Sequence, residues 1–137
     1  MSDNPTIRPI FEPVSAGLDD HQAKIITGAR TLAAERFAPR AEALDRDAVF
    51  PTENYRDLHE AGLLAICIAE ADGGLGADFK TYMLAAAEIG RFCGATALTW
   101  NMHVCSCLWT GALADDLDMS EDDRATHRRR RQSHYKR

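Results

Sequence analysis

The chain is poor in the residues that mark low-complexity and secreted proteins. Its 137 residues include only 9 glycines and 5 prolines, and its hydrophobic fraction of 45% is that of an ordinary globular protein. The first residues, MSDNPTIRP, are polar and lack the apolar stretch of a secretory signal. All 4 cysteines lie within or beside apolar runs: Cys67, Cys93, Cys105 and Cys107. These features predict a cytoplasmic protein with buried free thiols and no disulfide framework.

Recurrent metal and nucleotide motifs are also missing. His103 and Cys107 are four residues apart and share a helical face, but Cys105 points elsewhere and no second C-x-x-C or H-x-x-x-H element exists. A structural zinc site needs four converging ligands, so no metal site is predicted. The glycine-rich residues 73–76 lack the dinucleotide-binding spacing and the lysine of a P-loop. They are predicted to form a tight turn.

Charged residues are absent from one stretch, Phe92 to Leu113, which is long enough to span a bilayer. Six polar residues are scattered through it: Thr96, Thr99, Asn101, His103, Ser106 and Thr110. A lone membrane helix would leave the asparagine and the histidine without partners in hydrocarbon. We therefore expect a helix buried on all sides within a soluble protein, and no membrane partner.

Acidic residues are absent from the last ten positions, which hold six basic residues. The rest of the chain carries a net charge of −11, so its body is not expected to bind nucleic acid. The run Arg128–Arg131 has three interpretations: a solvated helix face, a phosphate-binding patch, or a consequence of where the chain ends. Because the acidic segment 115–123 lies just upstream and could neutralise it, the solvated face is favoured.

The apolar spacing predicts an all-α fold. Residues 1–17, with three prolines, should form an extended arm. A helix over 21–38 would start after a cap at Asp19 or Asp20, and Pro39 should kink or break it before the pattern resumes through Leu44. Its core-facing stripe is predicted at Ile25, Ile26, Ala29, Leu32, Ala33 and Phe37.

Residues that favour helix starts and ends predict four more helices. In the helix over 50–62, Pro51 suits the first helical position and Gly62 the left-handed position after the end. Residues 63–69 read as a buried strand or a buried connector. Asp78 should cap a helix over 79–93, and another follows over 96–113. The last should begin after Ser120, with Asp123 completing a weak capping box.

Three pieces of sequence occur in a fixed order between these helices: Phe50–Pro51 before Glu53, Ala61–Gly62–Leu63–Leu64, and Gly73–Gly74–Leu75–Gly76. In this order they resemble the N-terminal helical domain of the acyl-CoA dehydrogenases, over roughly residues 19 to 135. The chain departs from the family at Ala69, where a proline is usual. It also stops at Arg137, before the family's β-domain and second helical bundle. The resemblance implies an arm over 1–17 and a truncated helical domain over 18–137.

The resemblance implies an FAD-dependent oxidoreductase that forms an α,β double bond in an acyl-CoA thioester, working as a homo-oligomer. The missing parts usually hold most flavin contacts and the glutamate base. The isolated chain is therefore expected to be inactive and not to retain FAD, and its cofactor-binding residues are unknown. Two alternatives stay open: a flavin-dependent monooxygenase of the same fold, and, if the chain is complete at 137 residues, a non-catalytic helical interaction module.

The same resemblance implies that the helix over 96–113 walls the acyl pocket. The candidate wall residues are Thr99, Trp100, His103, Val104 and Cys107. On helical spacing, Trp100, His103, Val104, Cys107 and Gly111 share one face. Because cores and ligand pockets are lined by the same residue types, ordinary core packing is the favoured alternative.

His103 is the only candidate catalytic residue, and a weak one. Histidine titrates near neutral pH, and in monooxygenases of this fold a histidine near the flavin can assist. The favoured alternative is a neutral imidazole bonded to a backbone carbonyl between helices, because no catalytic partner can be identified. Glu70 and Asp72 are expected to be solvated charges in a surface loop.

Overall fold

The computed structural model describes residues 8–10 and 17–135, without the side chains of residues 112, 134 and 135. The described residues are 74% helical and contain no strand, which confirms the all-α prediction. Of the predicted arm over 1–17, residues 1–7 and 11–16 lie outside the described residues, as do the basic residues 136 and 137. The helices are α1 (Asp20–Leu32), α2 (Ala38–Asp47), α3 (Thr52–Glu60), α4 (Phe79–Gly90), α5 (Gly94–Thr110), α6 (Ala112–Asp115) and α7 (Glu121–Tyr135).

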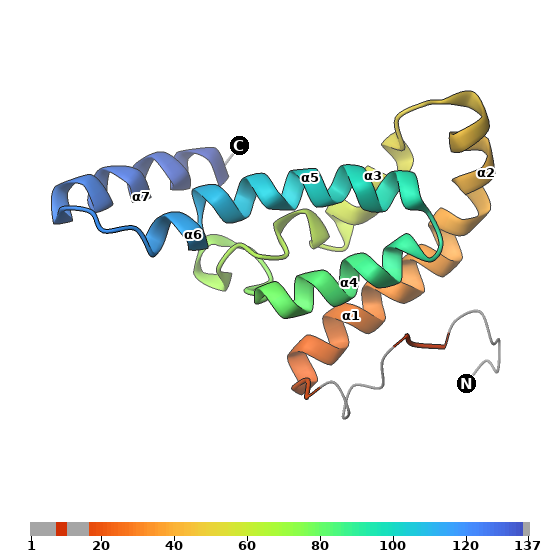
Figure 1. Cartoon of the computed structure of the whole chain (residues 1–137), viewed down its shortest axis with the longest axis horizontal. Helices are drawn as coiled ribbons and strands as arrows, with labels where there is room; N and C mark the ends of the chain where they lie inside the picture. The colour runs from red at the N-terminus through yellow and green to blue at the C-terminus, as the bar shows by residue number, and fades with distance from the viewer. Residues whose placement is uncertain (1–7, 11–16, 136–137) are drawn as a thin grey trace.

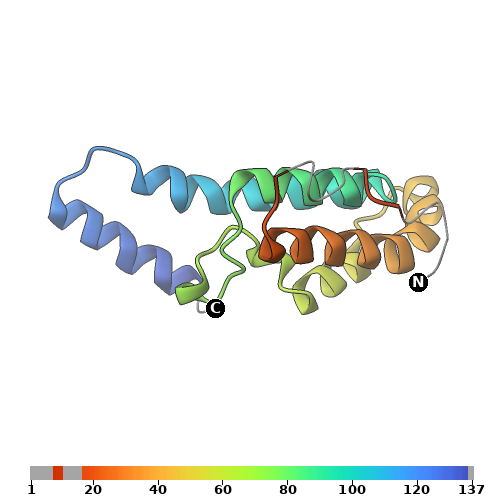
Figure 2. The same cartoon turned by 90° about the horizontal axis from the view of Figure 1, so that it is seen from below.

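The helices form a small bundle around α4. Helix α1 packs along α4, and α4 packs antiparallel to α5, while α3 lies behind α5 in the view of Figure 1. Helix α7 lies at one end of the molecule, away from α1 to α4 (Figure 2). Among the described residues, no helix combines the length and apolarity needed to cross a membrane.

Helix α1 begins at Asp19, the first of the two predicted caps. The Asp19 carboxylate accepts the Gln22 N–H at 2.8 Å, and the Gln22 side chain accepts the Asp19 N–H at 3.0 Å. This reciprocal capping box satisfies donors that a helix start would otherwise leave unpaired. The predicted stripe is buried except at Leu32, which is only partly buried.

Pro39 interrupts the helix without breaking its path. A π-helical turn, Ala33–Phe37, joins α1 to α2, and the Ala38 N–H bonds back five residues to the Ala33 carbonyl. Pro39 then lies in the first turn of α2, where its missing N–H has no intrahelical partner to lose. The change of helical register falls before the proline, and the chain continues from α1 into α2 without leaving a helical conformation.

Two predicted features around α3 need correction. Pro51 is the cap residue and not the first helical residue, because its ψ of 60° is non-helical and the helix starts at Thr52. The strand alternative for residues 63–69 is wrong: the segment is a buried connector with a 3₁₀ turn at Leu63–Ala65, followed by a second at Glu70–Asp72. Gly62 takes the predicted left-handed conformation, with φ 73°.

Helix α4 starts as predicted, since the Asp78 carboxylate accepts both the N–H and the hydroxyl of Thr81. It ends at Gly90, three residues early, and α5 therefore begins at Gly94 and ends at Thr110. The prediction that this helix is buried on all sides is wrong. Three of its apolar residues are largely exposed: Leu98 (66%), Met102 (62%) and Trp109 (69%). Other described helices cover only one side of it.

Helix α7 has the predicted start and an unexpected anchor. The Ser120 hydroxyl accepts the Asp123 N–H at 3.1 Å and donates to the Asp123 carboxylate at 2.7 Å. The side chains of residues 128–130 are exposed, in accord with a solvated face. Arg131 instead turns inward and pairs with Asp115 at 2.8 Å. Part of the acidic segment therefore neutralises the basic run, as expected.

Candidate functional site

Two of the five candidate wall residues belong to the core. Trp100 and Val104 are fully buried, and Trp100 packs edge-on against Tyr82 with ring centroids 5.7 Å apart. The Trp100 indole N–H donates to the Leu63 carbonyl at 3.0 Å. The buried indole needs such a partner, and the connector carbonyl supplies it.

His103 makes a similar contact one turn further along α5. Its Nε2 lies 2.9 Å from the Leu64 carbonyl oxygen, which can only accept, so Nε2 carries a proton. The ring is half-buried. This is the arrangement favoured from the sequence, an imidazole bonded to a backbone carbonyl. Together with Trp100, it fastens the connector to α5.

Thr99 and Cys107, the remaining candidates, are half-buried. The Thr99 hydroxyl donates to the Ala95 carbonyl of its own helix at 2.9 Å. The Cys107 sulfur lies 3.9 Å from His103 Nε2, and burial raises the pKa of its thiol. Neither residue presents an activated group, since a thiol is nucleophilic only when ionised.

A second thiol, that of Cys67, lies near Cys107. Burial, and then the nearby Cys107 and Asp78, raise the pKa of Cys67 to about 11. Burial also raises the pKa of Tyr82 to about 12, helped by the contact of its hydroxyl with the Cys105 sulfur at 4.0 Å. All these groups stay protonated at neutral pH. The cluster is therefore unreactive in ordinary conditions.

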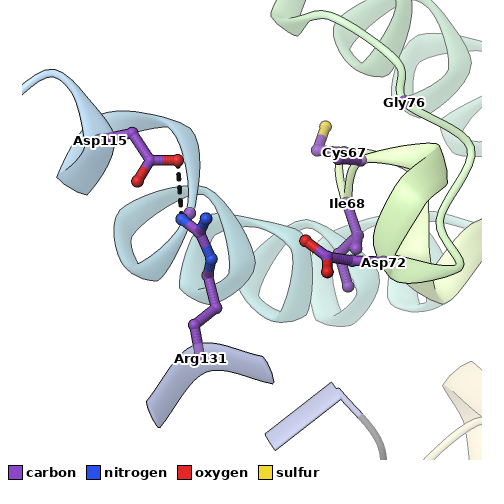
Figure 3. Close-up of a pocket in the computed structure, with 8 residues that line it drawn as sticks. Cys67, Ile68, Asp72, Gly76, Asp115 and Arg131 are labelled. Carbon is purple, nitrogen blue, oxygen red and sulfur yellow. Dashed lines mark hydrogen bonds and ion pairs between the residues drawn. The ribbon is translucent and has the colours of Figure 1, made fainter. Parts of the chain in front are cut away.

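None of the best-defined cavities in the described part of the chain is lined by the five candidates. One, of about 210 Å³, lies between the connector and α7 and includes Cys67, Asp72 and Asp115 (Figure 3). Arg131 reaches into it, and the Nε atom of this side chain is buried without a partner. Nothing in the sequence distinguishes this inward-pointing arginine from the three arginines before it, whose side chains are exposed.

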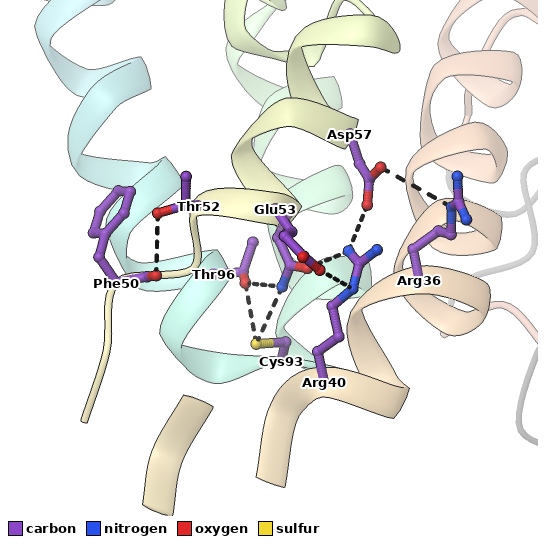
Figure 4. Close-up of polar contacts among 9 residues, drawn as sticks. Arg36, Arg40, Phe50, Thr52, Glu53, Asp57, Cys93 and Thr96 are labelled. Carbon is purple, nitrogen blue, oxygen red and sulfur yellow. Dashed lines mark hydrogen bonds and ion pairs between the residues drawn. The ribbon is translucent and has the colours of Figure 1, made fainter. Parts of the chain in front are cut away.

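The largest of these four cavities, of about 400 Å³, lies between α2 and α3. Beside it Arg40 donates to the Asn54 side chain at 2.8 Å and to the Asp57 carboxylate at 2.6 Å (Figure 4). Asn54 in turn donates to the Thr96 hydroxyl at 2.7 Å. This polar chain joins α2, α3 and α5. Sequence reasoning missed it, although Asn54 and Asp57 share the inward face of α3 with Leu58.

A third cavity, of about 270 Å³, lies between α1 and the connector, with Ile25, Gly28 and Leu75 in its wall. In the described part of the chain, no group of three or more His, Cys, Asp or Glu side chains is placed to bind a metal ion. The candidate residues and their neighbours form ion pairs, buried thiols and two rings that donate to backbone carbonyls. They do not bring together a nucleophile, a base and a site for a reacting atom.

Comparisons with known proteins agree with the helix order. A family model described as "Acyl-CoA dehydrogenase, N-terminal domain" matches residues 19–113. The probable acyl-CoA dehydrogenase YngJ of Bacillus subtilis is 36% identical over 55% of this chain and 20% of its own length. The mitochondrial short-chain specific acyl-CoA dehydrogenase of Mus musculus is 36% identical over 54% of this chain and 18% of its own.

A third relative is the acryloyl-CoA reductase (NADH) of Anaerotignum propionicum, 37% identical over 56% of this chain and 19% of its own length. No solved structure matches the chain. The chain spans about a fifth of the length of these curated relatives.

Proposed function

This chain belongs to the acyl-CoA dehydrogenase family through its N-terminal domain, and from this we propose that it forms the N-terminal portion of a flavin-dependent oxidoreductase. The observation that carries the proposal is the match over residues 19–113, which covers α1 to α5 together with the left-handed glycines Gly62, Gly73 and Gly76 and the Asp78 cap. The proposed reaction is α,β-dehydrogenation of an acyl-CoA thioester. In such enzymes FAD supplies the hydride acceptor, and the protein supplies position and electrostatics.

The described residues do not by themselves fit FAD. The well-defined cavities are small, and the arginine beside the largest is already paired with Asn54 and Asp57. The arginine that could bind a pyrophosphate there is thus already engaged by two protein acceptors. We therefore assign no cofactor-binding residue to this chain, and expect it to be inactive alone and not to retain FAD.

The contribution of this domain to the acyl pocket would be one face of α5. Since Trp100 and Val104 are in the core, the half-buried Thr99, His103 and Cys107 are the positions of the predicted wall that a substrate could still reach. We propose an acyl-CoA-like substrate, assembly as a homo-oligomer and a cytoplasmic location, the last because the thiols are free and partly or fully buried.

A chimaera tests the proposal directly. Residues 19–113 would replace the matching segment of the Bacillus subtilis relative, with the unaltered relative as control. We expect a yellow protein that retains FAD and oxidises acyl-CoA thioesters, whereas this chain alone is colourless. A folded chimaera without flavin would contradict the proposal. Rapid oxygen consumption by the reduced chimaera, with oxygen transfer to substrate, would indicate the monooxygenase alternative.

His103 can be tested in the same chimaera with two variants. His103→Gln keeps an N–H for the Leu64 carbonyl but removes the titratable ring, and His103→Leu removes both. For the structural role we expect the glutamine variant to keep thermal stability and turnover, and the leucine variant to lose stability. Loss of turnover in the glutamine variant at unchanged stability would instead make His103 catalytic.

A second candidate function is a helical interaction module. The observation that favours it is the exposed apolar row on α5, Leu98, Met102 and Trp109, because patches of this kind mark association surfaces. DNA sequence downstream of the Arg137 codon separates the two candidates. An in-frame continuation resembling a β-domain supports the oxidoreductase, and its absence supports the module.

A further inference from the structure

Glu88 is a buried carboxylate with an unusual partner. It lies on α4 and is only 1% exposed. Its Oε2 accepts from Arg91 at 2.7 Å, and the Arg30 guanidinium of α1 lies 3.6 Å from its Oε1. The same Oε1 also accepts the backbone N–H of Ile10 at 2.8 Å, from 78 residues away. A buried charge must be paired and hydrogen-bonded, and here the N-terminal segment supplies one of the bonds.

Arg91 makes the matching contact on the same segment. Its Nη1 donates to the Arg8 carbonyl at 2.6 Å. One acceptor near the end of α4 and one donor just after it, three residues apart, therefore hold a carbonyl and an N–H that lie two residues apart in the segment. Pro9, between them, has no N–H of its own. At the start of α4, Lys80 donates to the Gly17 carbonyl at 3.2 Å.

Each of the three contacts described above is made by a backbone atom of the N-terminal segment: the Ile10 N–H, the Arg8 carbonyl and the Gly17 carbonyl. The Ile10 side chain is 44% exposed, and Arg8 is exposed as well. Contacts to backbone groups depend little on the identity of the side chains. Residues 8–10, dark red in Figures 1 and 2, are thus held by Glu88 and Arg91 through their backbone.

The Arg30 side chain beside this contact is also shielded from solvent. Arg30 is 9% exposed, and among the described residues its Nε has no hydrogen-bond partner. The cavity beside it, lined by Arg30, Ile26, Leu84 and Glu88, measures about 10 Å³. That is room for one water at most. The ion pair between α1 and α4 is therefore kept from bulk water while the segment is in place.

We propose that Glu88 and Arg91, backed by Arg30, form a docking site for a peptide backbone, and that the chain's own residues 8–10 occupy it as a detachable strap. The strap shields the Arg30–Glu88 pair. When it leaves, Glu88 gains water and the pair becomes one of the weak kind found at surfaces. Docking of the N-terminal segment is thereby coupled to the closure of α1 on α4.

The test removes one N–H in the intact chain. Ile10→Pro deletes the donor to Glu88, and Ile10→Ala keeps it while trimming a partly exposed side chain. We expect Ile10→Pro to lower Tm by about 3–6 °C, the size expected for losing a charge-assisted bond in a domain of this length. Ile10→Ala should change it by about 1 °C or less. Equal Tm values for the two variants would overturn the proposal.

Hydrogen exchange gives a readout specific to docking. In the wild-type chain and in Glu88→Gln, whose amide oxygen still accepts, the Ile10 amide should exchange at least about tenfold more slowly than an unprotected amide. In Glu88→Ala the protection should vanish. An unprotected Ile10 amide in the wild-type chain would refute the docking site. The wild-type measurement and the comparison of Ile10→Pro with Ile10→Ala decide the question even where a Glu88 variant fails to fold.

Discussion

The two tryptophans of α5 have opposite environments although they belong to the same apolar run. Trp100 is fully buried and bonded to the connector, whereas Trp109 is 69% exposed. The difference is set by what lies opposite each residue. At Trp100 the connector supplies both a carbonyl and apolar cover. At Trp109 no comparable cover is present among the described residues.

Replacing each indole by a smaller ring should expose this difference. Trp100→Phe leaves the buried Leu63 carbonyl without its donor, and we expect a loss of about 1–3 kcal/mol in the free energy of unfolding. Trp109→Phe, the matched control, should cost less than about 0.5 kcal/mol. Urea unfolding followed by circular dichroism measures both. Similar costs for the two would show that the indole bond contributes little.

The Cys67 thiol should make the protein sensitive to alkali. Its pKa is raised from 9.0 to about 11, mainly by burial, so the folded state holds the proton more tightly than the unfolded state. The resulting stabilisation is present below pH 9 and is lost as the pH rises toward 11. Unfolding free energy measured across this window should fall less steeply in Cys67→Ser. Tyr82 acts in the same direction at still higher pH, and most of the rise in its pKa should remain in that variant, because burial is its largest cause and Cys67 the smallest.

At the scale of elements, the connector between α3 and α4 should tolerate substitution poorly. It folds back on itself, with the Gly76 N–H bonded to the Ile68 carbonyl at 2.8 Å and the Leu75 N–H to the Ala65 carbonyl at 3.1 Å. At Gly74 a Cβ atom would overlap the Ile68 carbonyl, which is backbone and cannot move aside. The glycine is needed for this close approach.

Two glycine-to-alanine changes should therefore shift the free energy of unfolding in opposite directions. Gly74→Ala should destabilise the chain by about 2–3 kcal/mol, because the backbone must shift. Gly28→Ala, on the exposed side of α1 with nothing within 4 Å of the new methyl group, should stabilise it by about 1 kcal/mol. Thermal unfolding of the two variants checks both signs. A Gly74→Ala protein as stable as wild type would contradict the close approach.

At the scale of the whole molecule, the bundle leaves one face of α5 bare. Leu98, Met102 and Trp109 are spaced by four and seven residues, so they follow one side of the helix. The described residues of α5 carry no charge, so two copies could meet there without like charges opposing each other. We therefore expect the isolated chain to self-associate through this face. It should also be colourless, because it is not expected to retain FAD.

A charge on this face should prevent the association. Met102→Lys should shift the sedimentation behaviour to monomer, while Val49→Lys, at a similarly exposed apolar residue on another face, should not. Trp109 offers a direct signal, since its emission should move to shorter wavelength with rising protein concentration. Association that both lysine variants retain, with unchanged emission, would place the contact elsewhere.

Local chemistry in the sequence was enough to determine several helix boundaries. Asp19, Asp78 and Gly62 act within three or four residues of themselves, through side-chain caps and a left-handed backbone, so their effects can be read without the fold. The family likeness rests on the same short-range signals and their order. The π turn ahead of Pro39 was beyond this reasoning, because a proline predicts an interruption but not its form.

Tertiary structure alone decided which apolar residues are buried and which polar residues meet. Leu98 and Val104 are of one chemical kind, yet the first is exposed and the second is buried. Arg40 meets Asn54, and Glu88 meets the Ile10 N–H, only because distant segments pack together. Burial and pairing depend on neighbours supplied from elsewhere in the chain, and the spacing within one helix carries no information about them.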